Sequence, residues 1–303
     1  MRVDSELLKL DTCCKVYRVG AFGGKTLTAV RNVTFDVRPG EVVSLIGESG
    51  SGKSTIGRMV LRLSPITAGT ITFEGVDVST LKGRGLKDYY SNVQGVFQDP
   101  FSSYNPIFKA DRVFKLIRQE YFHGIAGHEW SAKLESSLEA VGLNPADVMN
   151  KYPHQLSGGQ LQRLLIARAL LLDIKLLVAD EVISMLDAST RIDVLNLLAE
   201  LKTRGLGILF ITHDLSLGNY ISERTVILRR GSVVESGATD KVFGNPQHAY
   251  TKMLLAAVPH LHTKWEQGAA TGNGRVAEAD VEATSLVEFD EDHFVATANG
   301  SAS

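Results

Sequence analysis

The sequence predicts an α/β protein with a parallel sheet at its centre, a β-rich lobe before it and a helical insertion within it. Within residues 6 to 46, apolar and polar residues alternate in several pieces, which is typical of strands, and Pro39-Gly40 indicates a turn between two of them. Residues from about 106 to 172 are mostly helical, with apolar spacings of three and four in "WSAKLESSLEAVGL". Strand-like "KLLVAD", "GILFIT" and "TVILRRG" then alternate with helical "TRIDVLNLLAELKTRG", the order of parallel β-α-β units.

The composition favours a globular protein with a well-filled core. The chain has 303 residues, of which 44% are hydrophobic and 22% are charged. A net charge of -2 without any basic run gives no reason to expect nucleic acid as a partner. No stretch reaches the roughly 18 apolar residues of a membrane span, so at a membrane this protein would dock.

The two cysteines indicate the redox environment of the protein, and the C-terminal residues differ in composition from the rest of the chain. Cys13 and Cys14 are adjacent in a predicted strand, where their side chains point to opposite faces, so we interpret them as ordinary thiols in a reducing compartment. After His262 the chain has eight acidic and two basic residues, which predicts an acidic extension over 263–303. An unstructured tail stays open for 263–284, whereas "SLVEF" and "HFVA" favour a short strand or docked segment. His293 as a metal ligand is the less favoured interpretation.

A phosphate-binding loop stands between a strand and a helix. "GESGSGKST" fits G-x-x-x-x-G-K-[ST], directly after the apolar strand "EVVSLI". Glycines suit this loop because backbone N–H groups must point into one concavity, and a Cβ would obstruct some of the required dihedrals. The helix N-terminus adds partial positive charge at the same place. The predicted nucleotide-binding residues are Gly47, Ser49, Gly50, Gly52, Lys53, Ser54 and Thr55.

Two adjacent acids end the apolar run "LLVADE". Buried carboxylates are costly without a cation or hydrogen bonds, so Asp180 and Glu181 indicate a metal, a reactive water or both. Phosphoryl-transfer sites hold Mg²⁺ with the loop hydroxyl and a strand-ending acid, which assigns Ser54 and Asp180 as metal ligands. Glu181 would then orient or deprotonate the attacking water as general base. The alternative is that both acids cap the helix that follows.

A second anion-binding helix start lies upstream in "HQLSGGQLQRLLIARALL". Ser157, Gly158, Gly159 and Gln160 open an apolar helix, whose exposed N–H groups suit phosphate. With the phosphate loop and "LLVADE", this stretch closely resembles the ATPase subunits of ATP-binding cassette (ABC) transporters over about residues 5 to 260. The resemblance implies a P-loop NTPase ABC cassette with a RecA-like core, an N-terminal antiparallel β lobe and a helical subdomain at about 106–172. The ATPase domain would span 1–262.

The resemblance also implies roles for further residues. Tyr17 would stack on adenine, Gln98 in "VFQDP" would touch Mg²⁺ and the attacking water, and Asp187 in "SMLDAS" would lie at a dimer seam. His213 in "ITHDL" would contact the γ-phosphate and steady Glu181. Plainer interpretations are a core aromatic for Tyr17, and strand ends for Gln98 and His213 with Thr212 or Asp214 capping the next helix. The implied catalytic residues are Glu181, His213, Gln98 and Lys53, and Ser157, Gly158, Gly159 and Gln160 would complete the partner's nucleotide site.

Two segments resemble one branch of the ABC transporters. "VFQDPFSSYNP" and "FGNPQHAYTKMLLAAVP" are similar to the dipeptide, oligopeptide and nickel permease ATPases, with departures at Tyr104 and Ala249. Val182, directly after Glu181, departs from the wider ABC family, in which many members have Pro at this position. The branch implies ATP and Mg²⁺ as cofactors. Many members bind an iron-sulfur cluster near the C-terminus, but this chain has no cysteine after Cys14, so we predict no cluster.

The branch also implies a location and partners. The chain would sit peripherally at the cytoplasmic face of the cell membrane, with a second, non-identical ATPase or a second copy of itself. Two transmembrane permease subunits and an extracellular solute-binding protein would complete an importer. Oligo- or dipeptides are the first expectation for the substrate and di- or oligosaccharides the alternative. An ABC ATPase without a transport role is less favoured, because the chain has neither long coiled-coil heptads nor a second cassette.

Overall fold

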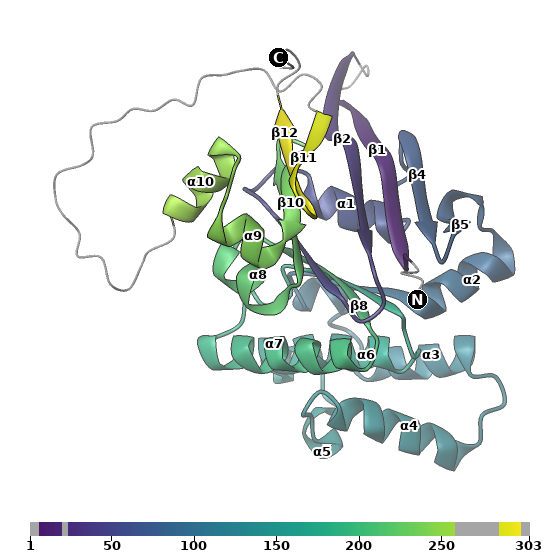
Figure 1. The fold of residues 1–303 in the computed structure, drawn as a ribbon. Helices are drawn as coiled ribbons and strands as arrows, with labels where there is room; N and C mark the ends of the chain where they lie inside the picture. Colours follow the sequence, from purple (N-terminus) through teal and green to yellow (C-terminus); the bar gives the residue numbers. More distant parts are fainter. Residues whose placement is uncertain (1–5, 20–23, 258–284, 298–303) are drawn as a thin grey trace, which may run out of the picture.

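The computed structural model describes residues 6–19, 24–257 and 285–297 and contains two sheets (Figure 1). A four-stranded antiparallel sheet has the order β2 (Lys25–Val37), β1 (Leu8–Val19), β4 (Ala68–Phe73) and β5 (Val76–Asp77). This is the predicted β lobe. An eight-stranded sheet has the order β11 (Ser285–Asp290), β12 (His293–Thr297), β10 (Ser232–Ala238), β9 (Arg224–Arg229), β3 (Val42–Ile46), β8 (Gly207–Thr212), β7 (Leu176–Asp180) and β6 (Val93–Val96).

The predicted extent of the β lobe needs one correction. The strand Val42–Ile46 belongs to the eight-stranded sheet, where β3 pairs in parallel with both β8 and β9. All five of its residues are buried, as expected of a parallel strand covered on both faces. In β1 and β2, by contrast, buried and exposed residues are mixed, because one face of this sheet meets solvent. The lack of alternation between apolar and polar residues, with only Ser44 as a polar residue, therefore indicates a strand of the central sheet.

The parallel strands bring distant loops to one edge. The strands β6, β7, β8, β3 and β9 run in parallel, which confirms the predicted α/β core. Their carboxyl ends therefore face the same way, and the loops after Ile46, Asp180 and Thr212 meet at this edge. Beyond β9 the sheet continues with the antiparallel strands β10, β12 and β11.

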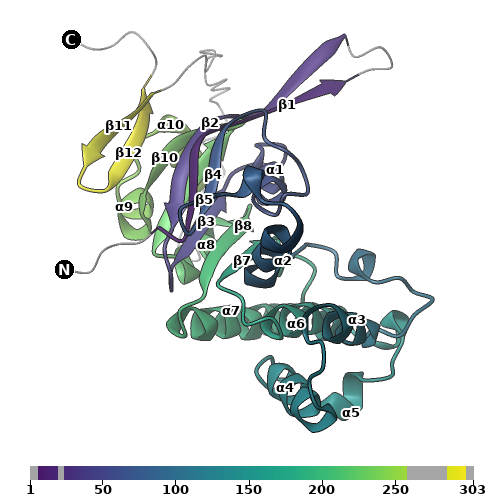
Figure 2. The ribbon, with the colours of Figure 1, turned by 90° about the vertical axis from the view of Figure 1, so that its right-hand side faces the viewer.

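The helices of the middle segment lie together at one end of the molecule, away from β1 and β2 (Figures 1 and 2). Those within the predicted insertion are α3 (Arg112–Tyr121), α4 (Gly127–Glu139), α5 (Pro145–Val148) and α6 (Gly158–Leu170). Helix α2 was not predicted from the sequence, because its first turn contains Gly83 and Gly85, which are poor helix formers. The remaining helices are α1 (Lys53–Val60), α2 (Gly83–Asn92), α7 (Ala188–Thr203), α8 (Leu215–Ile221), α9 (Thr239–Gly244) and α10 (Ala249–Ala256).

The C-terminal residues form a hairpin beside the core sheet. "SLVEF" and "HFVA" lie in β11 and β12, and β12 pairs with β10 from Gly237↔His293 to Glu235↔Val295. The expectation of a strand here is therefore confirmed. Residues 263–284, for which an unstructured tail was the alternative, lie outside the described residues, as does the domain boundary predicted at residue 262.

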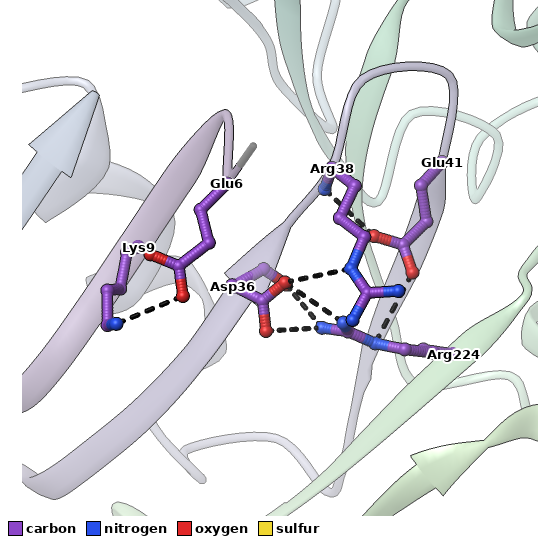
Figure 3. Close-up of polar contacts among 6 residues, drawn as sticks. All are labelled: Glu6, Lys9, Asp36, Arg38, Glu41 and Arg224. Carbon is purple, nitrogen blue, oxygen red and sulfur yellow. Dashed lines mark hydrogen bonds and ion pairs between the residues drawn. The ribbon is translucent and has the colours of Figure 1, made fainter. Parts of the chain in front are cut away.

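One arginine contacts two carboxylates, and its bonds to one of them join the two sheets (Figure 3). The Arg224 guanidinium at the start of β9 donates to both carboxylate oxygens of Asp36 in β2, each at 3.0 Å. Its Nε lies 3.3 Å from Glu41 Oε1, and the Arg38 backbone N–H donates to Glu41 Oε2 at 2.8 Å. Burial raises the pKa of Glu41, and Arg224 counteracts this effect. Figure 3 also shows the exposed Lys9–Glu6 pair, which lies apart from this network.

We expect Arg224→Ala to lower the free energy of unfolding by about 2 kcal/mol, because it leaves two partly buried carboxylates without their shared cation. Denaturant unfolding measures this loss. Arg38→Ala is the matched control: its side chain is 44% exposed and lies 3.6 Å from Asp36, so the loss should stay below about 1 kcal/mol. Equal losses for the two variants would contradict the role assigned to Arg224.

Candidate active site

The loop between β3 and α1 is held by close backbone contacts. A Cβ at Gly47 would lie 2.1 Å from the Leu228 carbonyl oxygen of β9, and one at Gly52 would lie 2.4 Å from the Ala29 carbonyl oxygen of β2. Gly52 also has a φ of 105°, in the left-handed region that favours glycine. The loop thus sits between both sheets, and glycine is required at both positions. Gly50 has a positive φ at the exposed tip, and Thr55 lies in the first turn of α1.

Lys53 opens α1 and folds its side chain back over the loop. Its ammonium donates to the Gly47 carbonyl oxygen at 2.6 Å and to the Glu48 carbonyl oxygen at 2.8 Å, and the residue is 4% exposed. Burial lowers the pKa of Lys53, while the nearby carboxylates of Glu181 and Asp180 act in the opposite direction. A buried positive charge is therefore placed beside the concave face of the loop.

Asp180 ends β7 against the start of α1. The Ser54 hydroxyl donates to Asp180 Oδ1 at 3.1 Å, which brings together the two predicted metal ligands. Burial raises the pKa of Asp180, and the bond from Ser54 counteracts this effect. A hydroxyl and a carboxylate are oxygen ligands of the kind that Mg²⁺ prefers alongside substrate phosphates. Within the described ranges, no group of three or more His, Cys, Asp or Glu side chains could hold a metal by itself.

Glu181 faces His213 from the neighbouring strand end. Glu181 Oε1 lies 3.1 Å from His213 Nδ1, and the Glu181 N–H donates to the Ile211 carbonyl oxygen at 2.9 Å. Glu181 has a φ of 49°, an uncommon conformation for a residue with a side chain. The alternative of helix capping does not fit these two acids, because Asp187 is the N-cap of α7. Asp214 caps α8, as the plainer interpretation of that segment expected.

Many of the predicted catalytic and nucleotide-binding residues line one cleft of about 550 Å³. Five separate chain segments supply its walls: the phosphate loop with the strand end and helix start beside it, the turns after β6, β7 and β8, and helix α10. Three lining residues were not predicted from the sequence: Ile46, which ends a strand, Glu48, which stands at a variable position of the phosphate-loop motif, and Leu254, which belongs to no motif. The lining residues are Ile46, Gly47, Glu48, Ser49, Ser54, Gln98, Glu181, His213 and Leu254.

The second anion-binding helix start lies elsewhere. Ser157, Gly159 and Gln160 line a separate pocket of about 280 Å³. The Ser157 hydroxyl accepts from the Gln160 N–H at 3.2 Å, and Gln160 Oε1 accepts from the Ser157 N–H at 2.9 Å, so the two residues form a capping box. Gly158 begins α6 beside them. Within one chain these residues therefore do not join the cleft at the phosphate loop.

Asp187 and Tyr17 also lie outside the cleft. Asp187 accepts from the Ser189 and Thr190 hydroxyls and from the Thr190 N–H, and these bonds lower its pKa, that from Ser189 most of all. Thr190 lines the same pocket as the start of α6. Tyr17 lies in β1, with the Lys15 ammonium 4.8 Å from its ring centroid. The adenine-stacking role of Tyr17 and the dimer-seam role of Asp187 stay predictions.

Comparisons with known proteins agree with this arrangement. The family model described as "ABC transporter" matches residues 30–184. The chain belongs to the ABC transporter family. A second model, "Oligopeptide/dipeptide transporter, C-terminal region", matches residues 234–283. Among the residues that the structure describes, no helix is long and apolar enough to cross a membrane.

Individual relatives cover most of this ABC ATPase. A putative peptide import ATP-binding protein of Brucella ovis is 45% identical over 258 residues, which cover 84% of this chain and 80% of that protein. The oligopeptide transport ATP-binding protein OppF of Streptococcus mutans is 44% identical and covers 76% of this chain and 75% of its own length. A dimeric ATP-binding cassette in a post-hydrolysis state, bound to ADP and Pi, superposes with a TM-score of 0.68. It is 29% identical and covers 77% of this chain and 98% of its own.

We expect Lys53→Ala to weaken ATP binding roughly 10- to 100-fold, the range of one hydrogen bond to a charged group. Equilibrium titration with ATP measures the loss. The matched control is Lys175→Ala, a half-exposed lysine paired with Glu74 outside the cleft. Unchanged ATP affinity in Lys53→Ala would contradict the assignment of the phosphate loop.

Proposed function

We propose that this chain is the ATP-hydrolysing subunit of an ABC importer, and that it couples ATP binding and hydrolysis to the uptake of oligo- or dipeptides. The observation that carries the ATPase part is the convergence of Ser54, Gln98, Glu181 and His213 on one cleft beside the phosphate loop. The match of residues 234–283 to an oligopeptide/dipeptide transporter region and the names of the relatives support peptides as the substrate.

The predicted catalytic and binding residues in and beside the cleft each have a proposed task. The loop N–H groups and the Lys53 ammonium bind the phosphates of ATP. Ser54, Asp180 and Gln98 would hold Mg²⁺, which neutralises phosphate charge when bound. Glu181 takes the proton of the attacking water as general base, and His213, 3.1 Å from its carboxylate, orients that carboxylate. The left-handed backbone at Glu181 aims the side chain into the cleft rather than along β7.

The separate position of Ser157 supports a paired arrangement. A phosphate site that lies away from the cleft can act on ATP only if a second cassette presents its own phosphate loop to it. Closure of such a pair is stabilised only while ATP lies between the two subunits. We propose a second, non-identical ATPase as partner, two transmembrane permease subunits that place the chain at the cytoplasmic face of the membrane, and an extracellular solute-binding protein.

We expect Glu181→Gln to reduce ATP turnover by roughly two to four orders of magnitude, the usual reach of a positioned general base. ATP binding should stay near normal, because the amide keeps the shape of the side chain. Phosphate release and equilibrium ATP binding are the two measurements. Glu135→Gln, an exposed glutamate in α4, is the matched control and should keep normal turnover. Turnover of Glu181→Gln near that of the unchanged chain would remove Glu181 from the base role.

We expect the purified chain with Glu181→Gln to remain mainly monomeric with ATP and to dimerise with the second ATPase of its transporter. Light scattering after size-exclusion chromatography measures this. In membranes, Ser157→Arg should abolish peptide uptake, whereas Ser136→Arg on the exposed face of α4 should not. A stable ATP-dependent homodimer together with uptake that needs no second ATPase would contradict the paired-subunit proposal and leave the ATPase proposal standing.

A further inference from the structure

The C-terminal part of the chain reaches the phosphate loop through one side chain. The Tyr250 hydroxyl, from the first turn of α10, accepts a hydrogen bond from the Glu48 N–H at 3.2 Å. The tyrosine is 2% exposed and packs in a small core with Ile46, the last residue of β3. We propose that Tyr250 is a positioning residue for the phosphate loop, and that the C-terminal hairpin β11–β12 holds it in place through the buried Glu235–His293 pair.

The contact fixes one peptide group from both sides. The carbonyl oxygen of Gly47 and the N–H of Glu48 belong to the same peptide unit. Lys53 donates to that carbonyl oxygen at 2.6 Å, and Tyr250 accepts from that N–H. Rotation of this peptide would break both bonds at once. Since the direction of each peptide in this loop decides where its N–H groups point, Tyr250 helps to define the concave face that receives phosphate.

The proton on Tyr250 stays in place under ordinary conditions. Burial raises the pKa of its phenol, so the side chain is neutral near pH 7. The Arg229 guanidinium lies 5.0 Å from the ring centroid and covers the aromatic group. A neutral hydroxyl accepts from the loop N–H without placing a negative charge next to phosphates.

A chain of hydrogen bonds leads from Tyr250 to the C-terminal hairpin. The His248 imidazole caps α10 by accepting from the Tyr250 N–H at 3.1 Å. The Glu235 carboxylate in β10 accepts from the backbone N–H groups of Gln247 at 2.7 Å and His248 at 3.0 Å. His293 Nε2 in β12 lies 2.8 Å from Glu235 Oε1. The segment before α10 is therefore held by a carboxylate that the hairpin in turn holds.

The Glu235–His293 pair belongs to the interior of the protein. The side chain of Glu235 is 0% exposed and that of His293 is 2% exposed. A buried carboxylate must find hydrogen-bond donors, and the three groups named above supply them. Loss of one donor would leave part of that carboxylate unsatisfied and loosen the segment that carries Tyr250. His293 thus acts on the loop from a position 245 residues further along the sequence than Glu48.

The plainer interpretation is that Tyr250 only fills space in the core. The variant Tyr250→Phe distinguishes this packing role from the proposed positioning role. The variant keeps the ring and its packing and removes the oxygen. We expect the Kd for ATP and the KM to rise roughly 3- to 10-fold, the range of one neutral hydrogen bond, while kcat at saturating ATP changes less than about twofold. The matched control is Tyr89→Phe, a tyrosine that is 3% exposed and donates to the Val60 carbonyl oxygen away from the loop. It should affect stability without changing the Kd.

The hairpin is tested with His293→Leu, which removes a donor to Glu235 and keeps a side chain of similar bulk. We expect the Kd for ATP to rise in the same direction as in Tyr250→Phe, by roughly 2- to 5-fold, with the protein still folded by circular dichroism. Unchanged ATP affinity in a folded Tyr250→Phe variant overturns the proposal. A shift in Tyr250→Phe without a shift in folded His293→Leu overturns the role of the hairpin.

This inference rests on the proposed ATPase function. The variant Lys53→Ala distinguishes failure of the Tyr250 role from failure of the ATPase proposal. If Lys53→Ala weakens ATP binding and Tyr250→Phe does not, only the positioning role fails. If neither variant changes ATP binding, the phosphate-loop assignment itself fails. Loss of affinity in both, with Tyr89→Phe unchanged, supports both.

Discussion

The close approach of two glycines to neighbouring backbone is the constraint on which the site depends. Gly47 lies against the Leu228 carbonyl of the core sheet, and Gly52 lies against the Ala29 carbonyl of the β lobe. The phosphate loop therefore has its shape only where the two sheets are correctly placed relative to each other. The bonds of Arg224 to Asp36 join these sheets, so a polar contact outside the cleft contributes to the geometry inside it.

Much of the site could be predicted from the sequence because its residues stand in short motifs, and the parallel sheet explains why these motifs meet. Once "EVVSLI", "LLVAD" and "GILFIT" are assigned to neighbouring parallel strands, their following residues must meet at one edge. Ser54, Asp180, Glu181 and His213 then come together although up to 159 residues separate them. The strand order explains their proximity, whereas their roles were predicted from the motifs.

The contacts that were not predicted involve chain segments whose sequence shows neither a clear periodicity nor a motif that specifies the contact. Nothing in "FGNPQHAYTK" says that its tyrosine hydroxyl reaches Glu48, 202 residues away. The partner of Glu235 is equally hidden, because β12 joins the sheet after a long interval of chain. The assignment of Val42–Ile46 to the lobe failed for a different reason: strand signals identify strands but do not say which sheet a strand joins. The available clue was that its residues, apolar except for Ser44, do not alternate with exposed polar ones.

The hairpin β11–β12 also covers the edge of strand β10 and becomes the outer edge of the eight-stranded sheet. Without β12, strand β10 would present unpaired N–H and C=O groups around residues 235–237, together with a buried carboxylate at Glu235 that had lost a donor. The outer strand β11 is mostly exposed and contains Glu288 and Asp290, so its free edge is acidic. Like charges disfavour strand addition by another copy of the chain. The hairpin thus replaces an edge open to aggregation with one that repels it.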